Sequence, residues 1–180
     1  MPGIGWGEFA LELPATFNDS YTPDGMTLND IVAPEHIITE LSAKDRWEAL
    51  DEMVDRLVEC GSLKVENRDA VIDVVKKRES QMSTGIGFGI AIPHATTDLI
   101  DEVVGALGRS KEGIDFDALD NQPVSLVVLF LVPQGQFQKH LHTLATIAKQ
   151  LHNKQFRESV ENAPDAASIN EILGQPLDRA

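Results

Sequence analysis

One segment of the chain combines residue types that suit group-transfer chemistry. Residues 83–94 read Ser-Thr-Gly-Ile-Gly-Phe-Gly-Ile-Ala-Ile-Pro-His. Three glycines on alternate positions lead through an apolar run to Pro93, which immediately precedes His94. A neutral imidazole can accept and pass on a phosphoryl group near neutral pH. The pattern therefore predicts a histidine nucleophile held at the end of a strand.

The proline and the glycines constrain the backbone around His94. Proline fixes its own φ and favours an extended conformation at the residue before it, so the chain entering His94 is stiff and can aim the ring. Gly85, Gly87 and Gly89 remove side chains where another surface could approach closely. Their spacing is not G-x-G-x-x-G, and the chain has no G-x-x-x-x-G-K-[ST] sequence, so neither a dinucleotide site nor a P-loop is predicted. We expect the glycines to support a phosphoryl-binding loop, and we expect no cofactor.

Two hydroxyls and an arginine could assist His94. Ser83 and Thr84 open the segment, and their hydroxyls could donate to a phosphoryl group or satisfy the backbone of a turn. Arg78 ends a predicted helix, and its planar guanidinium could hold phosphoryl oxygens. It could equally be a C-terminal cation that the helix dipole favours. Periodicity leaves both alternatives open.

Two further histidines fall on a helix predicted over residues 136–151. Residues two apart on a helix do not share a face. His140 falls at the border of the apolar stripe, beside Ile147 and Leu151, whereas His142 falls on the polar flank. His140 is therefore the better candidate for a half-buried, oriented imidazole, and a border histidine bonded to a carbonyl is the alternative.

Other kinds of site fit the sequence less well. His94, His140 and Asp98 would make a three-ligand zinc site on paper. No H-E-x-x-H or similar spacing supports it, so we expect no metal. No G-x-S-x-G sequence marks a hydrolase nucleophile. His36 and His152 are expected to be structural or exposed.

Charge and composition narrow the class of function. The chain has 180 residues, a formal net charge of −14 and 42% hydrophobic residues. The acidic balance argues against nucleic acid, whose phosphates need a basic surface, and against an anionic membrane surface. The one cysteine, Cys60, excludes an intrachain disulfide, and no apolar run reaches about 18 residues. With no signal-peptide pattern at the N-terminus, we expect a cytoplasmic protein without membrane insertion.

The order of predicted elements gives an α/β fold with a mixed central sheet sandwiched by helices on both faces. Residues 1–25 contain prolines and turn formers and predict an irregular N-terminal extension, so the domain is expected over residues 26–180. Strands are expected over residues 37–41, 87–93, 103–110 and 124–132. The last of these is almost continuously apolar, as in a central strand covered on both faces.

Helices are predicted between and after these strands. Helical spacing is clear in the stretch that Ser42 caps and Gly61 ends, and again over residues 67–79, where Val71, Val74 and Val75 form the inner side. Further helices are expected over residues 136–151, 154–162 and 166–173.

From about Met26 to Leu173 the chain resembles a complete EIIA domain of the bacterial sugar phosphotransferase system, of the fructose, mannitol and nitrogen-regulatory type. The matching pieces occur in family order: Met26–Ile31, Arg78-Glu79, Ser83–His94, Val124–Pro133 and His140-Leu141.

The resemblance implies roles for the candidate residues. His94 would accept a phosphoryl group from the phosphocarrier HPr, His140 would assist without being modified, and Arg78 would steady the phosphoryl group. An EIIB domain or a regulatory target would be the downstream partner. The implied fold, a mixed sheet between helices, agrees with the predicted elements.

Other stretches of the chain resemble the nitrogen-regulatory branch of this family. They are Gly105–Ser110, Gly113–Phe116 and Leu129–Pro133. With no EIIB or membrane EIIC segment fused to the domain, a stand-alone regulator is expected. A sugar-specific EIIA that donates phosphate to an EIIB during sugar uptake is the alternative.

Overall fold

The computed structural model describes residues 28–175, except the side chains of residues 137–140, 142–144 and 146. The N-terminal extension predicted over residues 1–25 lies outside the described residues. The described residues form six strands: β1 (Val32–Ile38), β2 (Gly85–Gly87), β3 (Ile90–Ala91), β4 (His94–Thr97), β5 (Val104–Ile114) and β6 (Val124–Pro133). The α-helices are α2 (Arg46–Glu59), α3 (Arg68–Gln81), α4 (Phe137–His152), α5 (Lys154–Asn162) and α6 (Ala166–Leu173). Two 3-10 helices, η1 (Leu28–Asp30) and η2 (Val65–Asn67), complete the order.

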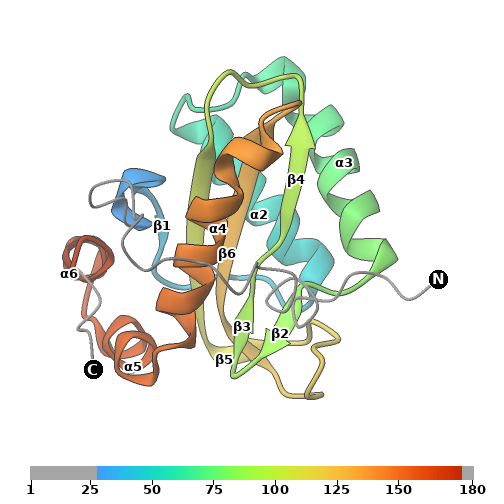
Figure 1. Ribbon diagram of the computed structural model, residues 1–180. Helices are drawn as coiled ribbons and strands as arrows, with labels where there is room; N and C mark the ends of the chain where they lie inside the picture. Colours follow the sequence, from blue (N-terminus) through green and yellow to red (C-terminus); the bar gives the residue numbers. More distant parts are fainter. Residues whose placement is uncertain (1–27, 176–180) are drawn as a thin grey trace.

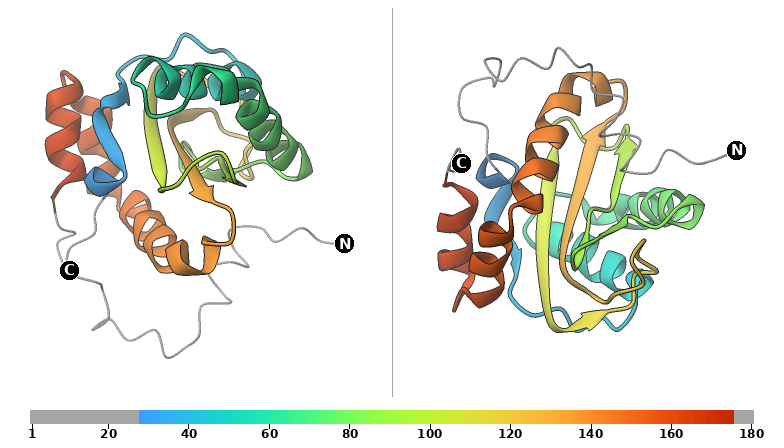
Figure 2. Two further views of the ribbon diagram at one scale, coloured as in Figure 1. Left: turned by 90° about the horizontal axis from the view of Figure 1, so that it is seen from above. Right: turned by 60° about the horizontal axis from the view of Figure 1, so that its bottom comes forward.

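The strands form one mixed sheet, as predicted. Its order is β1-β5-β6-β3-β2, and β4 pairs with β6 beyond the end of β3 (Figure 1). β5 and β6 are antiparallel along one edge of β6, whereas β3 and β4 run parallel to β6 along its other edge. Helices α2 and α3 cover one face of the sheet, and α4, α5 and α6 lie on the opposite side (Figure 2).

Strand β6 is central, which confirms the prediction from its apolar run. Its side chains alternate between two hydrophobic clusters, as the pleat of a strand requires. One cluster contains Val127, Leu129 and Leu131 together with side chains of α2 and α3. The other contains Leu126, Val128 and Phe130 together with side chains of α4, α5 and α6.

The strand predicted over residues 87–93 is wrong, because the chain reverses inside it. Gly87, Phe88 and Gly89 have φ values of 97°, 59° and 76°, and they turn β2 back onto β3 as an antiparallel pair. Glycine adopts positive φ without steric cost. Pro93 lies between β3 and β4. His94 is therefore the first residue of a strand, whereas the sequence predicted it at the end of one.

The first long helix begins later than predicted. Asp45, and not Ser42, is the N-cap of α2, because its carboxylate accepts a hydrogen bond from the backbone N–H of Glu48 at 2.9 Å. Ser42 instead donates its own backbone N–H to the carboxylate of Glu52. The predicted inner side of α3 also needs one change: Val71 and Val75 are buried, but Val74 is 38% exposed.

The cap geometry gives a direct test of stability. We expect Asp45→Ala to lower the free energy of unfolding by about 1 kcal/mol, because the first turn of α2 loses its side-chain acceptor. Ser42→Ala is the matched control and should change it by less than about 0.5 kcal/mol, since the exposed Ser42 contributes its backbone N–H. Urea denaturation followed by circular dichroism measures both, and equal effects would contradict the assignment of the cap.

Candidate functional site

His94 is held at the start of β4 by contacts on both sides of Pro93. The Pro93 carbonyl accepts the backbone N–H of Phe130 on β6 at 3.0 Å, which joins β4 to the central strand. The ring nitrogen Nδ1 of His94 lies 3.0 Å from the carbonyl oxygen of Ile92. A carbonyl can only accept, so Nδ1 carries the proton and the lone pair of the neutral ring is on Nε2.

The surroundings of His94 keep its ring neutral. Burial lowers the pKa of His94 from 6.5 to about 4, because the charged imidazolium loses solvation. The positive charge of Arg78 also lowers the pKa, and the hydrogen bond to the Ile92 carbonyl opposes both effects. At neutral pH the ring is therefore uncharged, the form that a nucleophilic imidazole requires.

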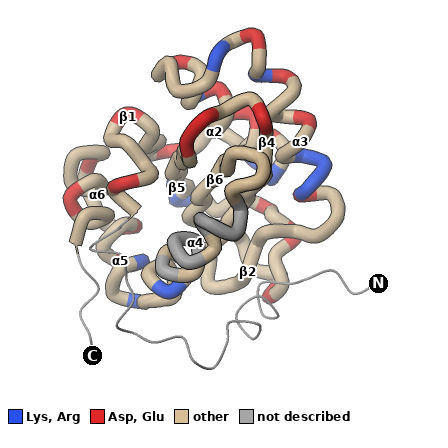
Figure 3. Tube along the Cα trace, turned by 45° about the horizontal axis from the view of Figure 1, so that its top comes forward, with Lys and Arg blue, Asp and Glu red and all other residues tan. Residues whose placement is uncertain are grey.

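A cavity of about 320 Å³ lies between α3 and β4, in front of His94. Among the described residues, its lining comes from these two elements alone: Val74, Lys77, Arg78, Gln81, His94, Ala95 and Thr96. Lys77 and Arg78 belong to a basic stretch on α3, in a chain whose net charge is −14 (Figure 3). Their side chains make the cavity suitable for an anion.

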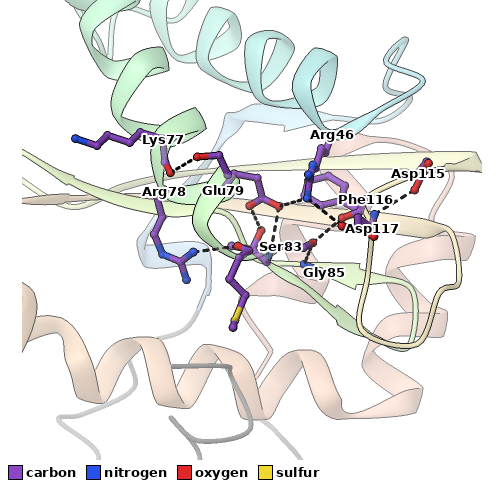
Figure 4. Close-up of polar contacts among 12 residues, drawn as sticks. Arg46, Lys77, Arg78, Glu79, Ser83, Gly85, Asp115, Phe116 and Asp117 are labelled. Atoms are coloured by element: carbon purple, nitrogen blue, oxygen red, sulfur yellow. Dashed lines mark hydrogen bonds and ion pairs between the residues drawn. The ribbon is translucent and has the colours of Figure 1, made fainter. Parts of the chain in front are cut away.

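Arg78 fits both roles that the sequence left open, a C-terminal cation of the helix and a ligand of phosphoryl oxygens. Its Nη1 donates to the carbonyl of Met82, the C-cap residue of α3, at 3.1 Å (Figure 4). It therefore acts as a C-terminal cation of the helix. It also lines the cavity at His94, where its guanidinium could hold phosphoryl oxygens.

The hydroxyls of Ser83 and Thr84 are engaged within the protein. Ser83 Oγ donates to the carbonyl of Phe116 at 2.5 Å and accepts from the N–H of Gly85 at 3.1 Å. Thr84 Oγ1 donates to the carboxylate of Glu79 at 2.6 Å. In this structure, both hydroxyls stabilise the loop that leads to His94.

The three glycines also support the loop from outside the His94 cavity. A side chain at Gly85 would place its Cβ 2.8 Å from Ala118 Cβ, so the close approach of the segment around Ala118 requires glycine. Gly87 and Gly89 form the turn between β2 and β3 described above. The three glycines contribute to the site by allowing the backbone to turn and pack closely before it reaches His94.

His140 lies in the first turn of α4, and its side chain is outside the described part of the chain. Whether it reaches His94 stays a prediction, and the same holds for the side chain of His142. Within the described residues, no group of three His, Cys, Asp or Glu side chains could hold a metal ion. No helix among residues 28–175 is both long and apolar enough to cross a membrane.

Sequence reasoning missed two residues of this region. Lys77 lines the cavity, and the signal was its position beside Arg78 at the end of a predicted helix. Glu79 is 1% exposed and continues the buried spacing of Val71 and Val75 by one further step of four residues. A carboxylate at a core position of a helix is a signal for a buried polar partner.

We expect an NMR titration to find the pKa of His94 near 4. In Arg78→Gln the pKa should rise, because one positive charge is removed, but it should stay below 6.5 because burial is the larger cause. The unfolded chain binds this proton below pH 6.5 and the folded ring only below about 4, so acidification between these values should also lower the free energy of unfolding. An unshifted wild-type pKa, or one unchanged in Arg78→Gln, would contradict these electrostatics.

Comparisons with known proteins identify the family of the chain. The family model described as "Phosphoenolpyruvate-dependent sugar phosphotransferase system, EIIA 2" matches residues 30–175. A fructose-specific EIIA component of Haloferax volcanii is 34% identical over 155 residues, covering 86% of this chain and 99% of that protein. A nitrogen regulatory protein of Bradyrhizobium diazoefficiens is 35% identical over 151 residues, covering 84% of this chain and 97% of its own.

Solved structures show the same fold. The nitrogen regulatory protein IIA-Ntr from Neisseria meningitidis superimposes with a TM-score of 0.73 at 31% identity, covering 81% of this chain and 98% of that chain. Enzyme IIA for mannitol from Escherichia coli, solved in complex with phosphorylated enzyme IIB, gives a TM-score of 0.64 at 20% identity, with 77% and 94% covered. At that identity the second likeness is one of fold.

Proposed function

The chain belongs to the EIIA 2 family of the phosphoenolpyruvate-dependent sugar phosphotransferase system, and we propose that it carries a phosphoryl group on His94. The observation that carries the proposal is the hydrogen bond from Nδ1 of His94 to the carbonyl of Ile92. It leaves the lone pair of the neutral ring on Nε2. Because the ring is partly buried and its pKa is lowered, Nε2 is unprotonated at neutral pH.

The transfer needs no proton at the accepting atom. Phospho-HPr is the proposed donor. The lone pair of His94 Nε2 forms a bond to phosphorus, while the bond between phosphorus and the donor atom of HPr breaks and its electron pair stays with that atom. The ring keeps its proton on Nδ1, and the Ile92 carbonyl, which accepts a hydrogen bond from Nδ1, stabilises the positive charge that develops on the ring.

The other site residues position and balance the transferred group. Phosphoryl transfer depends mainly on alignment and on compensation of charge at the phosphoryl oxygens. Arg78 and Lys77 line the cavity at His94 and supply positive charge there. His140 is proposed as the second histidine of the site, acting on the phosphoryl group without being modified.

The proposed fate of the phosphoryl group is regulation, with transfer to an EIIB domain as the second candidate. Similarity to a nitrogen regulatory protein along most of both chains supports a phosphorylation-dependent switch. Similarity to a fructose-specific EIIA component supports donation to an EIIB domain during sugar uptake. Passage of the label from phosphorylated protein to a purified EIIB domain favours the second candidate, and its retention favours the first.

Labelling with phosphoenolpyruvate, enzyme I and HPr tests the acceptor. We expect one acid-labile phosphate, mapped to His94 by mass spectrometry, and its complete loss in His94→Ala. His152→Gln is the control, since His152 lies at the end of α4 and is absent from the His94 cavity lining among the described residues. A folded wild-type protein that takes up no phosphate, or takes it up on another residue, would exclude this function.

His140 is tested by the rate of the same reaction. We expect His140→Ala to accept phosphate on His94 about tenfold more slowly, or slower still, because one group acting on the phosphoryl oxygens is lost. His142→Ala, two positions away on the same helix, should label at the wild-type rate. Wild-type labelling of His140→Ala would remove His140 from the site.

A further inference from the structure

We propose that Glu79 is a positioning residue for His94, acting through Thr84 and the backbone of Ile92. The consequence for phosphoryl transfer rests on the proposed function of His94. The geometry itself, a chain of hydrogen bonds from a buried carboxylate to the ring nitrogen, can be tested independently of that function.

The first link joins the end of α3 to the loop before β2. Glu79 is 1% exposed, and its two oxygens accept two hydrogen bonds from Thr84, which is fully buried. Oε1 accepts the backbone N–H at 3.0 Å, and Oε2 accepts the hydroxyl at 2.6 Å. Figure 4 shows the Glu79 side chain reaching from α3 to this loop. Both donors of Thr84 are thus fixed by one side chain.

The second link joins the loop to the ring. The carbonyl of Thr84 accepts the backbone N–H of Ile92 at 3.0 Å. The carbonyl of Ile92 accepts a hydrogen bond from Nδ1 of His94 at 3.0 Å. Because the Glu79 carboxylate holds Thr84 and the Thr84 carbonyl accepts the Ile92 N–H, a shift of Thr84 would move the backbone of Ile92 with it. The position of the Ile92 carbonyl, and with it the tautomer of His94, therefore depends on Thr84.

The third observation is the charge that accompanies Glu79. Nη1 of Arg46, the first residue of α2, lies 3.8 Å from Glu79 Oε1 and 3.8 Å from an oxygen of Asp117. A buried carboxylate is costly unless it is paired and hydrogen-bonded, and here it is both. An apolar side chain at this position could fill the core, as Val75 and Val71 do one and two turns earlier. It would provide no acceptor for the two Thr84 donors.

The same carboxylate fixes the other half of the site. Glu79 directly follows Arg78, so anchoring Glu79 to the loop also anchors the last turn of α3. The Arg78 guanidinium and the His94 ring face one cavity from two different elements. The contact between Glu79 and Thr84 ties the end of α3 to the loop that leads to His94, so its loss would also loosen the placement of Arg78 relative to the imidazole.

Three variants separate positioning from simple stabilisation. Thr84→Val keeps the volume of the side chain and the backbone N–H bond to Glu79, but removes the hydroxyl donor. Thr84→Ser restores that donor and is the matched rescue. Glu79→Met removes the carboxylate acceptor and places an apolar side chain among the buried apolar residues of α3. Heteronuclear NMR spectra and thermal unfolding establish that each variant is folded, and Thr84→Val decides the question where Glu79→Met does not fold.

The readout is the tautomer of His94, measured by two-bond proton–nitrogen correlation of the imidazole. Wild type and Thr84→Ser should show the proton on Nδ1, whereas Thr84→Val and Glu79→Met should show a mixture with the proton on Nε2. For phosphorylation by phospho-HPr, the two disrupting variants should lose about tenfold or more in kcat, with KM for phospho-HPr unchanged.

Two results would overturn the proposal. If both disrupting variants keep the wild-type tautomer and the wild-type rate of phosphorylation, the contact between Glu79 and Thr84 does not position the His94 ring. An unchanged tautomer with slower labelling would show that Glu79 acts through general stability. A wild-type protein that takes up no phosphate would instead defeat the proposed function, while the tautomer data would still decide whether Glu79 positions the ring.

Discussion

The site depends on the pairing of β6 along both of its edges. β5 occupies one edge over most of its length, while β3 and then β4 occupy the other. A strand buried on both faces and paired on both edges has little freedom to move. His94 is paired in register with Phe130 of this strand, so the reactive ring starts from a backbone that the whole core holds in place.

On that rigid backbone, two features determine the chemistry of His94: a hydrogen bond to its ring and the partial burial of the ring. The Ile92 carbonyl selects the tautomer, and removal from solvent lowers the pKa. The two effects oppose each other in the pKa, because the carbonyl also favours the protonated ring. Burial is the larger effect, so the ring is both oriented and neutral. A more exposed ring with the same bond would be partly protonated near pH 6 and a poorer nucleophile.

Local patterns in the sequence predicted much of this arrangement. The apolar run of β6 indicated a central strand, and the helices α5 and α6 occur at the predicted residues. The turn at Phe88 could not be predicted, because an aromatic residue between glycines in an apolar run is typical of a strand. Its backbone N–H is bonded to Asp120, 32 residues away, and such a contact leaves no local signal. The burial of Glu79 likewise depends on packing against Arg46 from another helix.

The cavity at His94 differs in charge from the chain as a whole. The chain is strongly acidic, yet two cations line the cavity in front of a neutral histidine. A phosphoryl group is negatively charged near neutral pH, so phosphorylation of His94 would place negative charge beside Lys77 and Arg78 and offset part of their positive charge. The cavity would become less positive than it is in the unphosphorylated protein. A partner that binds the surface of α3 and β4 could distinguish the two forms by this difference in charge. No movement of the sheet is needed, because the strands that carry the site are paired with β6.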